Sequence, residues 1–328
     1  MKIKFDGKQQ YQLDAINSVV DVFEGQPLAQ STYEIRIDEA STALQLSELG
    51  VGNNCVVAES HILENVQRVQ IRNNVDVSEE LQGMNFTTEM ETGTGKTYVY
   101  LRTLYELNSR YGFKKFVIVV PSVAIREGVM NSIELTKDHF QNLYGNMPVD
   151  AWVYDSRQVS RLRQFAASNQ MQILIINIDA FNKKDIAVIH QDNDRLSGKK
   201  PIEFVQATNP IVILDEPQNM ETDTAKDAIA SLNPLCTLRY SATHRNLYNL
   251  MYKLDPVKAY DLGLVKQIVV DSVLETSDFN RPFILVKSIQ TTTSLPVATI
   301  EIDVGGKSSP IRKAVHVQDQ RTQSHRQR

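Results

Sequence analysis

Between residues 84 and 243 the chain repeatedly alternates a short apolar run with a helical pattern, and this alternation restricts the fold more than any other feature. Six runs are predicted to be strands, at 86–90, 116–120, 151–154, 173–176, 211–214 and 237–240. The run at 116–120 is apolar on both faces, as in parallel sheets that helices cover on both sides. The sequence therefore predicts an α/β fold with a doubly wound parallel sheet, in which ligands bind outside the carboxyl ends of the strands.

The regions that flank this alternation have a different character. Residues 26–82 are irregular apart from a helix expected near 58–69, and we interpret them as an insertion within a first domain that spans 1–262. Residues 263–318 are rich in β-branched side chains, which predicts a β-rich appendage that begins a linker or a second domain. Residues 319–328 contain no apolar side chain, so we expect a disordered tail.

Composition excludes several classes of protein. No apolar run approaches the roughly 18 residues that a membrane span needs. The two cysteines, Cys55 and Cys236, have no CxxC spacing, which argues against a cysteine-rich zinc site and favours a cytoplasmic location. The net charge is −4, with 6 Lys/Arg against 14 Asp/Glu in residues 1–90 and 6 against 1 in 305–328. Nucleic acid remains a possible partner because local groups can bind phosphates.

The strongest motif is METGTGKT at 90–97, between a predicted strand and a predicted helix. Gly93 and Gly95 let the backbone wrap around a phosphate chain, and the following helix adds the positive end of its dipole. The Lys96 ammonium can reach β- and γ-phosphates, and the Thr97 hydroxyl can ligate Mg²⁺. Met90 stands where the general G-x-x-x-x-G-K-[ST] pattern has glycine, and the alternative is a plain glycine turn with an exposed lysine.

A second candidate motif ends the apolar run at 211–214, where Asp215 and Glu216 follow directly. Two carboxylates at the end of a buried strand cost free energy unless something pairs with them. In a phosphate-loop enzyme the first acid holds Mg²⁺ and the second can deprotonate the attacking water. We therefore predict Asp215 as a metal ligand and Glu216 as the general base. The alternative is a solvated start of a loop.

Weaker signals come from hydroxyl and amide side chains. Ser241 and Thr243 follow the strand at 237–240 and could hydrogen-bond the acidic motif, although such residues more often cap helices. Gln12 could hold an adenine through its amide. Pro121, Ser122 and Arg126 follow the strand at 116–120 and could contact a nucleic-acid phosphate; the alternative is a helix cap beside a solvent-exposed arginine.

Together these motifs resemble superfamily-two helicases and translocases, and more narrowly the restriction (Res) subunit of type III restriction–modification enzymes. The matching stretches are YQLDAI at 11–16, METGTGKTYVYLRTLYEL at 90–107, FVIVVPSVAIREG at 116–128, IINIDAFNK at 175–183, ILDEPQNME at 213–221 and LRYSATH at 238–244. The DEPQ and METGTGKT forms point to the type III enzymes. The resemblance covers roughly residues 1–317 and implies a RecA-like, P-loop NTPase fold.

The resemblance also implies roles for the matching residues. The ATP-binding set is Gln12, Thr92, Gly93, Thr94, Gly95, Lys96 and Thr97, with Thr97 and Asp215 on Mg²⁺ and with Lys96, Asp215 and Glu216 in hydrolysis. The residues expected to bind DNA or to couple hydrolysis to strand movement are Pro121, Ser122, Arg126, Gln218, Ser241 and Thr243. The implied partners are double-stranded DNA and a methyltransferase (Mod) subunit, and the implied process is restriction of foreign DNA by an endonuclease.

Two parts of such an enzyme are not expected within this sequence. Only about 65 residues follow position 263, too few for a second RecA-like domain, and Asp303 and Lys307 indicate a hairpin rather than a nuclease site. We therefore expect weak hydrolysis by the chain alone. Two alternatives remain: an ATP- and DNA-binding fragment that lacks effective catalysis after a truncation or frameshift, or another superfamily-two helicase that acts in repair or on RNA.

Overall fold

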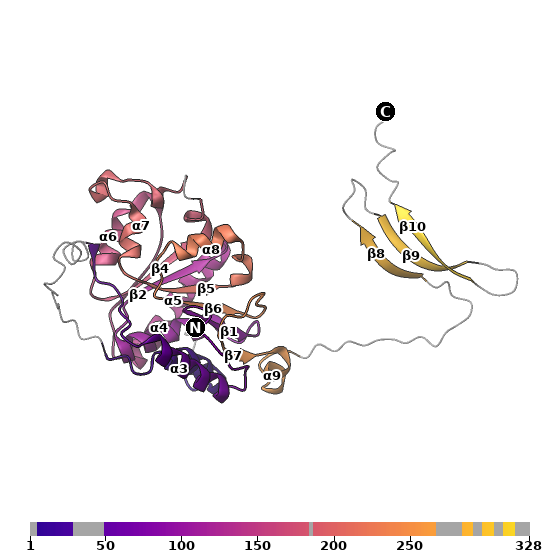
Figure 1. Cartoon of the computed structure of the whole chain (residues 1–328), viewed down its shortest axis with the longest axis horizontal. Coiled ribbons are helices and arrows are strands. Elements are labelled where there is room, and N and C mark those ends of the chain that lie inside the picture. The colour runs from indigo at the N-terminus through magenta and orange to yellow at the C-terminus, as the bar shows by residue number, and fades with distance from the viewer. Residues whose placement is uncertain are drawn as a thin grey trace, which may run out of the picture. The chain divides into compact units, whose positions relative to one another are not determined.

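The computed structural model of the chain describes residues 5–28, 49–183, 186–266, 284–290, 297–304 and 311–318. The chain divides into two compact units, Met1–Gln267 and Ile268–Arg328, and each unit has its own sheet (Figure 1). The tail predicted at 319–328 and residues 267–283 of the predicted β-rich appendage lie outside the described residues.

The first unit is built around a seven-stranded sheet with the order β3-β4-β2-β5-β6-β1-β7. Every pairing in it is parallel, so all its strands present their carboxyl ends at the same edge. The strands are β1 (Asn85–Met90), β2 (Lys115–Val120), β3 (Val149–Val153), β4 (Met171–Asn177), β5 (Ile211–Asp215), β6 (Cys236–Ser241) and β7 (Leu250–Leu254). The first six are the predicted strands. The seventh was missed; it is a short edge strand whose register against β1 shifts after Thr87.

Helices cover both faces of this sheet (Figure 1). One face packs against α1 (Gln10–Val20), α3 (Glu59–Arg72), α4 (Lys96–Tyr111) and α5 (Val123–Leu143). The other face packs against α6 (Ser160–Ala167), α7 (Pro201–Gln206) and α8 (Asp223–Ala230), and α9 (Pro256–Asp261) follows β7. The short 3₁₀ helices are η1 (Asp21–Phe23), η3 (Ser156–Gln158), η4 (Ile178–Ala180), η5 (Val188–His190), η6 (Asp194–Leu196) and η7 (Pro217–Asn219). None of the described helices combines the length and the hydropathy that a membrane span requires.

Residues 116–120 of β2 form a continuous apolar run because both faces of this strand are buried in the core. In β2, Phe116, Ile118 and Val120 belong to the cluster under α1, α3, α4 and α5, whereas Val117 and Val119 belong to the cluster under α6, α7 and α8. Each of these side chains is fully buried, and burying one contributes about 1.5–3 kcal/mol. The predicted α/β fold with a doubly wound parallel sheet is confirmed.

Two buried polar side chains join the elements at the amino ends of the strands. Asn53 donates from Nδ2 to the carbonyls of Lys115 (2.8 Å) and Asn209 (3.2 Å), and its Oδ1 accepts from the amides of Lys114 and Lys115. The Lys115 ammonium is also buried and donates to backbone carbonyls, among them Phe165 and Ser168, at the carboxyl end of α6. Part of the predicted 26–82 insertion thus packs directly against the sheet.

The second unit contains a three-stranded antiparallel sheet with the order β10-β9-β8. Its strands are β8 (Ile284–Gln290), β9 (Val297–Val304) and β10 (Ile311–Gln318). These bounds agree with the predicted β-rich appendage. In β9, Ile300 and Ile302 alternate with Thr299, Glu301 and Asp303, so one face is mainly apolar and the other polar.

Candidate functional site

The loop between β1 and α4 has the backbone of a phosphate cradle. Gly93 and Gly95 adopt φ values of +83° and +91°, a region that side-chain-bearing residues rarely occupy. A Cβ atom on Gly93 would find no heavy atom within 4 Å, so this side of the loop is open. Gly95 is the N-cap of α4, which directs the positive end of a 16-residue helix at the loop.

The N-terminal helix α1 holds this loop from the side. The Thr94 carbonyl accepts hydrogen bonds from the Tyr11 hydroxyl (3.1 Å) and from Gln12 Nε2 (3.3 Å). The loop closes on itself through Glu91, whose side chain accepts from the Thr92 amide and whose carbonyl accepts from the Thr94 hydroxyl. The structure therefore brings Gln12 against the loop, 82 residues away along the chain.

Asp215 ends β5 and is almost completely buried, with 6% of its surface exposed. Burial, and then the charge of Glu216, raises the pKa of Asp215 to about 6, while a hydrogen bond from Tyr100 and the charge of Lys96 lower it. The Tyr100 hydroxyl donates to Asp215 Oδ2 over 3.2 Å. Tyr100 lies three residues after Thr97 in α4, so the two residues share one face of the helix.

Glu216 is at the centre of a network that joins the loop to two other motifs. Lys96 Nζ lies 2.7 Å from Glu216 Oε1, and Gln218 Nε2 and the Ser241 hydroxyl donate to Oε2 over 2.7 and 2.8 Å. Burial by itself raises the pKa of Glu216, but these three hydrogen bonds outweigh it, so the pKa lies below its usual value. Thr243 joins this network through its backbone amide, which donates a hydrogen bond to the Ser241 hydroxyl. Glu216 also adopts a left-handed backbone (φ +57°), a strained state that typically costs 1–3 kcal/mol.

Sequence reasoning missed three supporting contacts around this network. Tyr100 could have been found from its spacing of three residues after Thr97. Buried Glu221 forms an ion pair with Arg239 of β6, which fixes the segment after the acidic motif to the sheet. His244 is mostly buried; one ring nitrogen contacts the Thr88 carbonyl (3.2 Å), and Nδ1 has no hydrogen-bond partner among the described residues.

The predicted DNA-contacting residues lie elsewhere along the same edge of the sheet. Ser122 is the N-cap of α5 and accepts a hydrogen bond from the Ile125 amide, as the alternative reading expected. Arg126 pairs with Glu127 at 2.8 Å and lines an open groove of about 860 Å³ beyond the ends of β3 and β4. Pro121 lies at the end of β2, beside Ser122. The structure thus does not bring these three residues into the network around Glu216.

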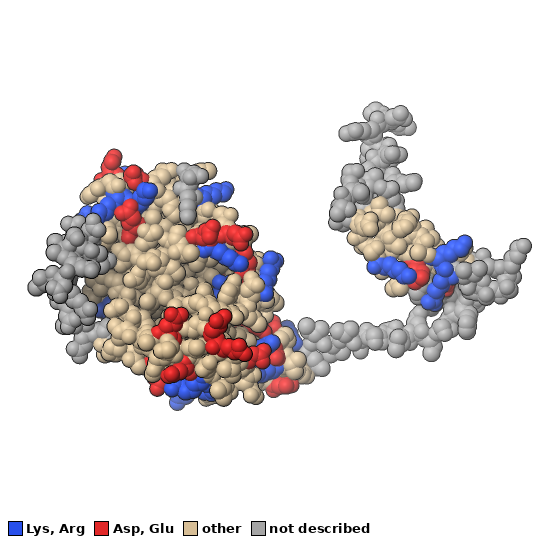
Figure 2. All heavy atoms as spheres, in the orientation of Figure 1, with Lys and Arg blue, Asp and Glu red and all other residues tan. Residues whose placement is uncertain are grey.

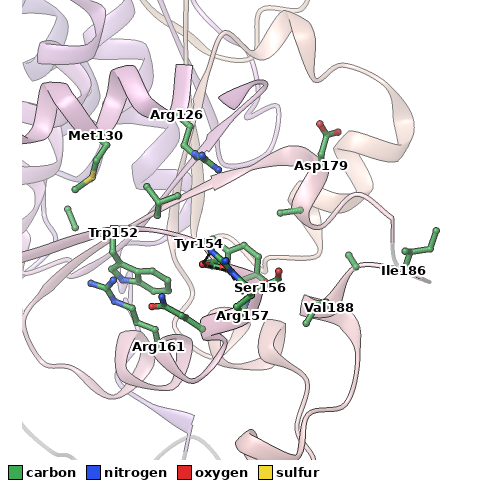
Figure 3. Close-up of a pocket in the computed structure, with 16 residues that line it drawn as sticks. Arg126, Met130, Trp152, Tyr154, Ser156, Arg157, Arg161, Asp179, Ile186 and Val188 are labelled. Carbon is green, nitrogen blue, oxygen red and sulfur yellow. Dashed lines mark hydrogen bonds and ion pairs between the residues drawn. The ribbon is translucent and has the colours of Figure 1, made fainter. Parts of the chain in front are cut away.

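Three arginines and two aromatic rings line this groove (Figure 3). Figure 3 shows Arg126, from α5, and Arg161, from α6, on opposite sides of it. The Arg161 guanidinium lies 4.7 Å from the centre of the Trp152 ring. Arg157 is the third arginine of the groove, and Tyr154 is its second aromatic residue.

The residues at the network fit a magnesium nucleotide better than a metal alone. No group of three or more His, Cys, Asp or Glu side chains that could hold a metal occurs within the described part of the chain. Mg²⁺ is usually bound through one or two carboxylates together with phosphate oxygens and water. One carboxylate, Asp215, a hydroxyl from Thr97 and an open glycine loop form such a donor set.

A parallel doubly wound sheet, a glycine loop that caps a helix, and an acidic strand end together define a P-loop nucleotide-binding domain of the helicase-like class. The family described as "Type III restriction enzyme, res subunit" matches residues 9–246, and the chain belongs to this family. The resemblance inferred from the motifs is confirmed. The chain is a helicase-like motor domain related to the Res subunits of type III restriction enzymes.

Individual relatives agree with this assignment. The chain is 35% identical over 219 residues to the StyLTI Res subunit of Salmonella typhimurium, a match covering 56% of this chain and 22% of that protein. It is 28% identical over 235 residues to the EcoP15I Res subunit of Escherichia coli, covering 65% and 24%. The chain therefore matches less than a quarter of the length of these curated relatives.

Proposed function

We propose that this chain binds Mg·ATP at the loop 91–97 and hydrolyses it with Asp215 and Glu216, as the motor domain of a type III restriction subunit. The observation that carries the proposal is the 2.7 Å contact between Lys96 and Glu216. These residues are 120 positions apart, and the contact puts the phosphate-loop lysine beside the acidic end of β5, which β6 separates from β1 in the sheet. Phosphoryl transfer needs such groups to converge on one phosphate.

The Lys96–Glu216 pair describes a resting arrangement. A triphosphate that enters the loop attracts Lys96, so the ammonium exchanges the carboxylate for phosphate oxygens. Glu216 is then free to accept a proton from water, while the hydrogen bonds from Gln218 and Ser241, which also lower its pKa, remain in place. When bound, Mg²⁺ would neutralise charge that develops on the phosphate oxygens, with Asp215 and Thr97 as its protein ligands.

The remaining contacts supply recognition and coupling. Gln12 lies against the loop at Thr94, where its amide can face the adenine of a nucleotide. Gln218 and Ser241 both bond to Glu216, so a change at Glu216 on hydrolysis alters the segments after β5 and β6. Through the Thr243 amide, that change reaches the loop after β6.

The groove beyond β3 and β4 is the proposed DNA contact. Arg126, Arg157 and Arg161 outnumber Asp155 and Asp179 among its lining residues, and arginines position a nucleic-acid backbone through its phosphates. Figure 2 shows acidic and basic side chains close together on the first unit's visible face, so DNA binding there depends on local groups. We propose that the ligand is double-stranded DNA and that a Mod subunit supplies recognition of the restriction site.

A comparison of Glu216→Gln with Glu134→Gln tests this function. Glu134 is an exposed residue of α5, so its variant controls for the loss of one carboxylate. We expect Glu216→Gln to keep its affinity for Mg·ATP and to lose about 10²–10⁴-fold in single-turnover hydrolysis, the usual contribution of a general base. Equal hydrolysis by the two variants would remove Glu216 as the base. Binding without hydrolysis in the wild type would favour the alternative of a binding fragment.

Titration with duplex DNA at several salt concentrations tests whether the groove binds DNA. Arg161→Ala should weaken binding and reduce the slope of log affinity against log salt by about 0.9, the value of one phosphate contact. Arg163, an exposed neighbour in α6 that does not line the groove, provides the control substitution Arg163→Ala. Identical slopes for the two variants would contradict DNA binding in the groove.

A further inference from the structure

Tyr100 contacts one of the two side chains proposed to hold Mg²⁺, although it is not among the residues predicted for the site. Its side chain is fully buried, and its hydroxyl donates to Asp215 Oδ2 over 3.2 Å. Burial raises the pKa of Tyr100 well above its usual value, and a side-chain interaction with Thr97, one helical turn earlier, lowers it. The phenol group therefore connects α4 to the end of β5.

Packing fixes the position of this hydroxyl. The ring centres of Tyr100 and Tyr240 are 5.5 Å apart, and both rings belong to the core cluster between the sheet and α4. A ring enclosed in this way cannot change rotamer without opening the core. The hydroxyl is therefore a fixed point against which Asp215 is held.

Such an arrangement matters for metal binding because groups behind the ligands set their orientation. Losing an outer hydrogen-bond partner typically costs 10–100-fold in metal affinity. Asp215 is a single carboxylate on the last residue of a strand, so a rotation of its side chain would move both of its oxygens. A bond to Oδ2 opposes this rotation.

We propose that Tyr100 is a positioning residue for magnesium, and that its hydroxyl holds Asp215 and Thr97 at the separation required by a magnesium nucleotide. This inference rests on the proposed function. The alternative is that Tyr100 serves only as a packed ring. Phenylalanine keeps the ring and removes the hydroxyl, so it separates the two roles.

The test compares Tyr100→Phe with Tyr240→Phe in the full chain. Tyr240 lies in the same core, and its hydroxyl bonds weakly to Thr103 (3.5 Å) instead of to Asp215. The affinity of each protein for a fluorescent ATP analogue is measured in EDTA and then across a Mg²⁺ titration. We expect Tyr100→Phe to keep the affinity seen in EDTA and to need about 10–100-fold more Mg²⁺ for half-maximal enhancement. Tyr240→Phe should follow the wild type in both conditions.

A double-mutant cycle makes the test independent of overall stability. If Tyr100 acts through Asp215, Tyr100→Phe should have no further effect on Mg²⁺ dependence in an Asp215→Asn background. Wild-type Mg²⁺ dependence in Tyr100→Phe, or an equal effect of the substitution in both backgrounds, would overturn the inference and leave the proposed function intact. A wild type whose nucleotide binding ignores Mg²⁺ would instead overturn the proposed function.

Discussion

The two edges of the seven-stranded sheet differ in the hydrogen-bond partners of their polar side chains. At the amino ends, Asn53 and Lys115 bond to backbone amides and carbonyls. At the carboxyl ends, Lys96, Asp215 and Glu216 bond to other side chains, and two of them form an ion pair with each other. Both edges thus satisfy buried or partly buried polar groups, but only the carboxyl edge does so with groups that can change partners.

This difference separates structural contacts from functional ones. A backbone carbonyl cannot leave its element without unfolding, so a side chain bound to it acts as a permanent link. An ion pair between two side chains can exchange one charge for a ligand at little structural cost. The strained backbone of Glu216 occurs at the exchangeable edge, as expected where strain is part of a site.

The largest expected effect on stability belongs to the amino edge. Asn53→Ala removes four hydrogen bonds and leaves buried backbone groups without partners, so we expect a loss of about 3 kcal/mol in unfolding free energy. Mg·ATP affinity should not change, because the residue lies at the opposite ends of the strands. Urea unfolding and nucleotide titration of the same sample measure both quantities. A loss of affinity without a loss of stability would break the comparison.

At the carboxyl edge we expect a smaller effect on stability, which is measurable only at acidic pH. Burial lowers the pKa of His244 to about 4, although its hydrogen bond to Thr88 raises it. The unfolded chain binds this proton at higher pH than the folded chain, so His244 lowers the stability of the fold in acid. This loss of stability is absent above about pH 6.5 and grows as pH falls toward 4. We expect His244→Gln to remove about 2 kcal/mol of the wild type's loss of stability between pH 7 and 4.5.

The control for this pH dependence is His61→Gln, because His61 is a half-exposed residue of α3. Its substitution should leave the acid limb of the stability curve unchanged. If His61→Gln and His244→Gln flatten the curve equally, His244 is not held in its neutral form at the carboxyl edge.

The sequence predicted the parts of the fold and site that depend on local pattern. Short strand-like runs that alternate with helical patterns identified six strands, and glycine spacing together with acids at a strand end identified the loop and its partner motif. The edge strand β7 was missed because no helix separates it from β6, so it does not follow the alternation of strands and helices. The roles assigned to individual site residues stay predictions.

The contacts that sequence reasoning missed join residues far apart in the chain. Asn53 meets Lys115 across 62 positions, and Tyr100 meets Asp215 across 115. The two residues of each pair do not share a motif, and only the packing of the elements brings them together. Long-range hydrogen bonds of this kind leave no periodic signal, which is why the positioning of the acidic motif emerged only from the structure.

The most direct test of the central claim is the affinity for Mg·ATP of Lys96→Ala beside that of Lys137→Ala, measured by calorimetry on the folded proteins. Lys137 is an exposed lysine of α5, so its removal changes the net charge equally. The account predicts wild-type affinity for Lys137→Ala and no measurable binding for Lys96→Ala, because the ammonium that exchanges Glu216 for phosphate is gone. Unchanged affinity in Lys96→Ala would contradict the assignment of the loop as a nucleotide site.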